Sequence, residues 1–377
     1  MKKIFRKLLG GTLLFGLTVS LTSCEDVLGH WEKPTPIPIT PTVEEVIKYG
    51  FQVTDLAGVD RTEAVTSLKM SNEDGTLVAE AEVSGGKITI KNTDLTAAAI
   101  TAAADFWFEA TVGTRKYVAK VNIDPATLSP ESDKTLTMAT LGDLAGQDGK
   151  FYATKEDIAT AGTTAVGVIA YIGSDAYSES IMDGGGHGLV LCLKNAASNV
   201  IWSTNKTSQA YTGNAFVTDV AGLKRTTGVS GYLATVALAT DATTYPAAAA
   251  AKNYTGLTAP AGTTGWFLPS VQQIVKMISA LGEVELPDSY NFLFFDASRE
   301  GATKWENAMA KAGTQGTDYE TMTKGGEGCY WYWTSSEKNV ANSYQLGFNL
   351  TPYGSFRLVD DGKDNSTNLM VRPVLAF

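Results

Sequence analysis

The sequence predicts an α+β protein, mostly β, in which a small β-sandwich precedes a larger domain with two main helices. Three observations support this prediction. Short alternating runs fill residues 45–125, continuous apolar runs bounded by glycine appear after residue 136, and helical patterns appear near residues 250 and 275. The chain has 377 residues, 44% of them hydrophobic, which is enough for two separate cores.

The chain begins with a basic segment and an apolar stretch that runs from Leu8 to Leu21 and precedes Cys24. This stretch is too short for a permanent membrane-spanning helix but has the length of a signal-peptide core. The residues Leu-Thr-Ser-Cys that end at Cys24 resemble a bacterial lipobox. The resemblance implies removal of residues 1–23 and lipidation of Cys24, whose acyl chains would anchor the protein in the outer membrane. The alternative is an ordinary secretory leader that contains a cysteine.

An acidic pair, Glu25 and Asp26, directly follows the predicted lipidation site. In Gram-negative gut anaerobes, such a pair resembles a signal for export to the cell surface. Four prolines then occur between residues 34 and 41, and they favour an extended, semi-stiff chain. We therefore predict that residues 24–44 form a tether and that the protein is exposed at the surface.

Alternating runs separated by turn residues predict the strands of the first domain. Asn, Asp and Gly residues between these runs favour tight hairpin turns. Because no helical pattern separates the runs, we expect a β-sandwich over residues 45–125. The predicted strands are 75–83, 86–92, 105–112 and 115–123.

The second domain, residues 136–377, combines buried strands with helices. Apolar runs at 165–173 and 187–195 are typical of strands covered on both faces. The strongest helical pattern starts after Ser270, which forms a capping box with Gln273, and Gly282 marks its end. Two further helices are predicted, one from Pro246 and a weaker one over 303–313.

The leader, the β-sandwich and the run 117–154 together resemble the fimbrillin-like surface proteins of gut anaerobes. In polymerising members of that family, an Arg-specific protease removes an N-terminal strand, and a strand of the neighbouring subunit fills the groove. The resemblance implies Arg61 as a candidate cleavage site. The alternative is a solvated loop arginine.

Three ordered motifs, at 265–270, 332–337 and 371–377, look like the C-type-lectin-like fold. The similar version of the fold is the one shared by formylglycine-generating-enzyme relatives and variable-receptor proteins. The resemblance implies a compact domain with two helices, a hairpin built from its termini and a loop-rich ligand face. It implies a turn at Thr334–Glu337 and core anchors at Trp331 and Trp333 or their neighbours, and at Trp266, Phe267 and Phe377.

Few residues in the chain are suited to catalysis. There are two histidines, and no Cys/His spacing indicates zinc, so we predict a protein that is not an enzyme and has no cofactor. The formal net charge of −10 and the absence of a basic stripe argue against nucleic acid as a partner. Cys192 and Cys329 could form a disulfide in an oxidising compartment, or Cys192 could be a small buried apolar residue.

The acidic segment 360–365 concentrates oxygen ligands. It could hold Ca²⁺, which takes about six to eight oxygen atoms, or it could be a solvated turn. The sugar-binding motifs of calcium-dependent lectins are missing from the chain. We therefore predict that no residue of the chain binds a metal ion.

We predict a ligand surface between Glu337 and Val371, where Tyr, Asn and Ser are frequent, as they are in adaptable binding surfaces. The function predicted is that of a lipid-anchored adhesin or pilus-tip-like subunit that binds a host or microbial glycan or protein. One alternative is a glycan-capturing lipoprotein of a polysaccharide-uptake system, with an aromatic platform at Tyr330, Tyr332 or Tyr353. The other is a structural pilus subunit whose partners are further pilus subunits. The candidate ligand residues are Lys338, Asn339, Asn342, Gln345, Asn349, Tyr353, Asp361, Lys363, Asp364 and Asn365.

Overall fold

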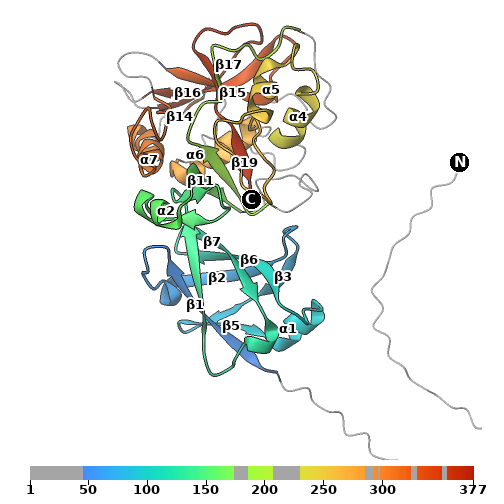
Figure 1. The fold of residues 1–377 in the computed structure, drawn as a ribbon, viewed down its shortest axis with the longest axis vertical. Coiled ribbons are helices and arrows are strands. Elements are labelled where there is room, and N and C mark those ends of the chain that lie inside the picture. The colour runs from blue at the N-terminus through green and yellow to red at the C-terminus, as the bar shows by residue number, and fades with distance from the viewer. Residues whose placement is uncertain are drawn as a thin grey trace, which may run out of the picture. The chain divides into compact units, whose positions relative to one another are not determined.

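The computed structural model describes residues 46–173, 186–206, 230–284, 293–295, 298–323, 329–349 and 355–377. The predicted signal peptide, the lipidated Cys24 and the tether lie outside these residues. Strands dominate the described part of the chain, and most of the described helices come from the C-terminal half of the sequence (Figure 1). The prediction of a mostly β, α+β protein is confirmed.

Eight strands form the N-terminal sheet, in the order β3-β2-β6-β7-β8-β1-β5-β4. The four strands predicted from alternation are all present, the first of them as β3 and β4. Alternation places one face of each strand inward: in β1, Phe51 and Val53 are buried, whereas Lys48 and Gln52 are exposed. The strands are β1 (Lys48–Asp55), β2 (Val65–Ser71), β3 (Leu77–Glu80), β4 (Glu82–Ser84), β5 (Lys87–Lys91), β6 (Ala104–Val112), β7 (Arg115–Ile123) and β8 (Lys134–Thr140).

The two ends of this sheet meet. Strands β3 and β4 are separated by Ala81 alone, and the Ala81 backbone N–H donates a hydrogen bond to the Leu68 carbonyl of β2 at 2.9 Å. The sheet therefore encloses one apolar core, to which β1, β2, β5, β6, β7 and β8 all contribute. Phe51 and Phe108 pack in this core, with ring centroids 5.8 Å apart.

The N-terminal sheet extends further along the chain than predicted. Strand β8 lies within the range assigned to the second domain, but it pairs in parallel with β1 and antiparallel with β7. The sheet therefore ends at Thr140 and not near residue 125. Parallel pairing joins β8 to a strand more than 80 residues earlier, and a local pattern cannot predict such a partner.

The C-terminal part contains two further sheets, with the orders β10-β9-β11-β12-β19 and β13-β18-β15-β16-β17-β14. The predicted strands at 165–173 and 187–195 correspond to β11 and β12, and both are largely buried, as expected. The strands are β9 (Leu144–Gly146), β10 (Phe151–Tyr152), β11 (Ala165–Ile172), β12 (Gly188–Cys192), β13 (Ala197–Ser198), β14 (Leu293–Phe295), β15 (Tyr330–Glu337), β16 (Asn342–Asn349), β17 (Ser355–Gly362), β18 (Leu369–Val371) and β19 (Val374–Ala376).

The strongest predicted helix is confirmed as α6. Ser270 and Gln273 form the predicted capping box, and the apolar stripe of the helix is buried against both sheets. Gly282 ends the helix, where a Cβ would lie 2.5 Å from the Ile278 carbonyl oxygen. The helices are α1 (Asn92–Ala97), α2 (Lys155–Ala161), α4 (Gly231–Leu238), α5 (Pro246–Lys252), α6 (Val271–Leu281) and α7 (Ser298–Ala310), and short 3₁₀ turns are η1 (Thr62–Ala64) and η2 (Pro125–Thr127).

Helices α6 and α7 share one core with the sheets on either side of them. Trp305 of α7 is fully buried, and its ring centroid lies 5.2 Å from Phe348 of β16 and 5.6 Å from Phe356 of β17. Among the described helices, none is both long and apolar enough to cross a membrane.

Candidate functional site

Residues Thr334–Glu337 form the end of strand β15 and not the predicted turn. All four side chains are buried, and those of Thr334, Ser336 and Glu337 have polar partners inside the domain. The Ser336 hydroxyl accepts a hydrogen bond from the Val271 backbone N–H at the start of α6, at 3.0 Å. The Thr334 hydroxyl donates to the Tyr344 carbonyl on β16, at 3.0 Å. These hydroxyls tie the strand to the helix and to the neighbouring strand.

The aromatic residues before this segment pack mostly inward. Trp333 and its neighbour Tyr332 are buried, as are the other predicted anchors, so these predictions are confirmed. Trp331 is only half-buried, and a Cβ at Gly347 would lie 2.5 Å from its ring. The ring therefore packs directly on the backbone of β16, a contact that only glycine permits. The other buried anchors are Trp266, Phe267 and Phe377.

Six of the ten candidate ligand residues lie together on two neighbouring turns and on the strand ends beside them. The first turn joins β15 to β16, and the second follows β17. They are joined by a hydrogen bond from the Lys363 backbone N–H to the Ala341 carbonyl, at 3.0 Å. We call this region the paired-turn surface. It consists of Lys338, Asn339, Asn342, Asp360, Asp361, Asp364 and Asn365, of which only Asp360 was not predicted.

Hydrogen bonds fix the first turn of the paired-turn surface. The Asn339 side-chain oxygen accepts from the backbone N–H groups of Ala341 and Asn342, both at 2.9 Å. Asp360 forms an ion pair with Lys338 and accepts a hydrogen bond from the Asn342 amide at 2.8 Å. The turn is therefore organised before any ligand arrives.

The second turn is organised in a similar way. Asp361 accepts hydrogen bonds from the Asn365 amide at 2.6 Å and from the Gly362 backbone N–H at 2.7 Å. Asp364 is exposed and pairs with Lys206 at 2.8 Å, and this hydrogen bond lowers the pKa of Asp364. The surface thus presents carboxylates and amides in fixed positions, which suits recognition of hydroxyl and peptide groups.

Two candidate ligand residues are buried, so the prediction that they are exposed is wrong. Lys363 has no exposed surface: its ammonium forms an ion pair with Glu337 and lies 4.9 Å from the centre of the Trp202 ring. Gln345 is 4% exposed, and its amide lies 3.4 Å from Asp361. Both support the paired-turn surface from beneath. The side chain of Asn349 and all of Tyr353 lie outside the described residues.

The acidic segment 360–365 has protein partners for its charges. Its carboxylates contact lysines and amides, as described above, and not one another. In the described ranges, no group of three or more His, Cys, Asp or Glu side chains is arranged to hold a metal ion.

The disulfide that the sequence allows as one of two possibilities is not formed. Cys192 and Cys329 are both buried and are not bonded to each other. Cys192 lies on β12 within an apolar cluster, and burial raises the pKa of its thiol to about 12. The alternative interpretation, a small buried apolar residue, is therefore correct for Cys192.

Arg61 lies in the ordered turn between β1 and η1. Its guanidinium donates to Asp55 at 2.7 and 3.0 Å, and its side chain is 38% exposed. Its backbone N–H donates to the Val53 carbonyl at 2.8 Å. A protease would have to displace these contacts to bind the segment.

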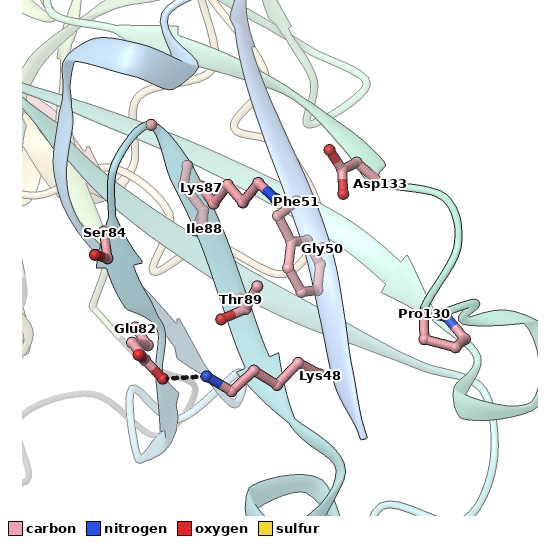
Figure 2. Close-up of a pocket in the computed structure, with 11 residues that line it drawn as sticks. Lys48, Gly50, Phe51, Glu82, Ser84, Lys87, Ile88, Thr89, Pro130 and Asp133 are labelled. Carbon is pink, nitrogen blue, oxygen red and sulfur yellow. Dashed lines mark hydrogen bonds and ion pairs between the residues drawn. The ribbon is translucent and has the colours of Figure 1, made fainter. Parts of the chain in front are cut away.

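A polar hollow of about 460 Å³ lies on the outer face of the N-terminal sheet (Figure 2). Gly50 lies within it and has no side chain to fill the space, and a Cβ there would lie 1.8 Å from an Asp133 carboxylate oxygen. Lys48 and Glu82 form an ion pair across one side at 2.8 Å. Lys87 and Asp133 supply further charges. Because these charges are solvated, the hollow would attract a small polar ligand only weakly.

Comparisons with known proteins do not assign the chain to a family. No protein-family model matches it, and no curated protein matches it. A crystal structure of a fimbrial protein from Bacteroides ovatus is similar over 88% of this chain and 71% of that protein, with 13% identity and a TM-score of 0.42. Values this low establish neither a shared fold nor a shared function.

Proposed function

We propose that the protein is a surface-exposed, lipid-anchored adhesin or pilus-tip-like subunit. In this proposal, Cys24 holds it in the outer membrane, and the C-terminal domain binds a host or microbial glycan or protein without catalysing a reaction. The leader and the fimbrillin-like and C-type-lectin-like sequence motifs motivate the anchor and the class.

The observation that carries the proposal is the paired-turn surface. Its polar side chains come from two turns, and they are held in place by one another and by the buried Glu337–Lys363 pair beneath them. A surface whose side chains are already ordered loses less conformational entropy when it binds a ligand. Amides and carboxylates fixed in this way can donate and accept hydrogen bonds to a bound ligand.

The test is a binding screen of residues 46–377 on a glycan array and a panel of host extracellular proteins, with and without EDTA. This fragment keeps β8 in its sheet, which a fragment starting at residue 136 would not. We expect binding that EDTA leaves unchanged. Binding that EDTA abolishes would assign the ligand to a metal site and contradict the proposal, as would a complete absence of binding.

Burial of Tyr332, one of three aromatic candidates, weakens the glycan-capturing alternative. Tyr332 is 2% exposed and cannot stack on a sugar, and Tyr330 is half-buried. Tyr330 stays a candidate for an aromatic platform, and Tyr353 lies outside the described residues.

The position of β1 favours a second function, that of a structural pilus subunit. Strand β1 lies between β8 and β5 inside the N-terminal sheet, and Arg61 follows it. Cleavage after Arg61 would cut the chain between β1 and β2. Loss of β1 would then open a groove lined by the buried core, as the fimbrillin-like resemblance implies.

This second function predicts that an Arg-specific protease converts the protein into higher oligomers. We expect cleavage after Arg61 to precede assembly, and Arg61→Lys to block both events. Digestion followed by size-exclusion chromatography measures the outcome, with Arg115→Lys as the matched control. A cleaved protein that stays monomeric, or assembly by the Arg61→Lys variant, would contradict the structural role.

A further inference from the structure

The N-terminal sheet and the C-terminal β-sheet with β12 and β19 share a buried apolar cluster, which we call the junction. Trp107 and Val118 enter it from the N-terminal sheet, and Val190, Leu375 and Phe377 enter it from the C-terminal one. The Trp107 ring centroid lies 5.5 Å from that of Phe377. Apolar packing in the junction therefore stabilises the association of the two parts.

His187 is an ionisable ring that stacks on Trp107 of the junction. It directly precedes β12, is 8% exposed, and lies nearly parallel to the Trp107 ring, with centroids 4.7 Å apart and an angle of 18°. Its backbone N–H donates to the Phe377 main-chain oxygen at 2.5 Å. Its Nε2 atom is buried and has no hydrogen-bond partner among the residues that the structure describes. Backbone hydrogen bonds between the ring and Glu73 and Asn72 favour its protonated form, so burial is the influence that opposes protonation.

Several charged groups face His187 from the N-terminal sheet. Glu73 and Asp74 lie on the β2–β3 turn and Glu109 on β6, and all three favour the imidazolium. Lys120 on β7 pairs with Glu73 and lies 5.9 Å from the Trp107 ring centre, so it offsets part of this attraction. The C-terminal part contributes two uncharged rings: Phe151 packs against Trp107, and Phe377 packs against Phe151.

Burial outweighs these attractions. Desolvation is the largest influence and lowers the pKa of His187, although the Glu73 carbonyl and the nearby carboxylates oppose it. The face of Trp107 also attracts a cation and acts in the same direction as the carboxylates. The closed junction therefore favours the neutral ring, whereas an opened, hydrated junction gives an ordinary histidine.

We propose that His187 makes the junction sensitive to acid: the neutral ring holds the two parts together, and the protonated ring favours their separation. The sign follows from linkage, because the open state binds the proton more readily than the closed state. The contribution of the neutral ring to the closed junction is fully present above the ordinary histidine pKa of about 6.5 and is lost progressively as the pH falls below that value. The opening equilibrium should rise up to about tenfold between about pH 7.5 and 5.5.

The chain contains two histidines, which makes a direct test simple. In a soluble protein of residues 25–377, labelled at histidine, NMR should give two titrating rings, with His30 as the internal reference. We expect His187 to titrate at lower pH than His30. Hydrogen exchange of β6 and of residues 186–192, corrected for the intrinsic effect of pH, should show the predicted rise in opening.

His187→Phe is the matched variant, because it keeps an aromatic ring on Trp107 and removes the titration. It should abolish the acid-induced rise in exchange, whereas His30→Ala should leave it unchanged. The proposal is overturned if His187 titrates at or above the pH of His30, if exchange at the junction is independent of pH, or if His187→Phe retains the wild-type dependence. The NMR titration needs no variant, so it decides the question even if His187→Phe does not fold.

Discussion

Replacing Lys363 with methionine should lower the free energy of unfolding by about 3–5 kcal/mol. The Lys363 ammonium is fully buried and pairs with Glu337, whose side chain is 3% exposed. The substitution would leave the buried Glu337 carboxylate without the lysine cation that balances its charge. Urea unfolding of residues 46–377, followed by circular dichroism, measures the change.

The matched control replaces both members of the pair, as Lys363→Met with Glu337→Leu. Removing both charges also removes the cost of burying one alone, so the double variant should recover most of the stability lost by Lys363→Met. A loss below about 1 kcal/mol for Lys363→Met would contradict the assignment of a buried pair. So would a double variant as unstable as the single one.

Trp305→Ala should destabilise the protein by a similar amount, about 3–5 kcal/mol. The indole is fully buried and contacts Phe348 and Phe356, so its removal leaves a cavity where α7 meets β16 and β17. The same urea unfolding experiment measures the effect.

The variant Trp305→Phe distinguishes the cost of forming a cavity from other causes of destabilisation. Phenylalanine keeps much of the aromatic packing and removes an indole N–H that has no hydrogen-bond partner among the described residues. We expect it to cost clearly less than the alanine substitution. Equal losses for the two variants would indicate that Trp305 stabilises the fold in some way other than by filling space.

The elements that the sequence predicts correctly are those whose causes are local. Helix α6 combines a capping box at Ser270 with an apolar stripe, and both signals lie within a dozen residues. The N-terminal strands follow from alternation within each run. These patterns need no knowledge of distant partners.

The errors concern residues whose surroundings are supplied by distant segments. Thr334–Glu337 has the composition of a turn, but Ser336 is buried because it bonds to the start of α6, 65 residues earlier in the chain. Lysine is usually exposed, but Lys363 is buried because Glu337 and Trp202 enclose it. Asp360 is not among the predicted residues, although it contacts Lys338 and Asn342. Its position in the acidic segment 360–365 is the feature of the sequence that points to it.

The central claim is that the paired-turn surface binds the ligand. The most direct measurement compares the affinity of residues 46–377 for the ligand found in the screen with that of the variant Asn342→Ala, Asp364→Ala, Asn365→Ala. The control variant is Asp105→Ala, Asn122→Ala, which removes a hydrogen-bonded surface pair from the N-terminal sheet. We predict a loss of affinity of about 10- to 100-fold for the first variant, because several polar contacts are removed together, and no change for the control. Unchanged affinity in a correctly folded triple variant would contradict the account.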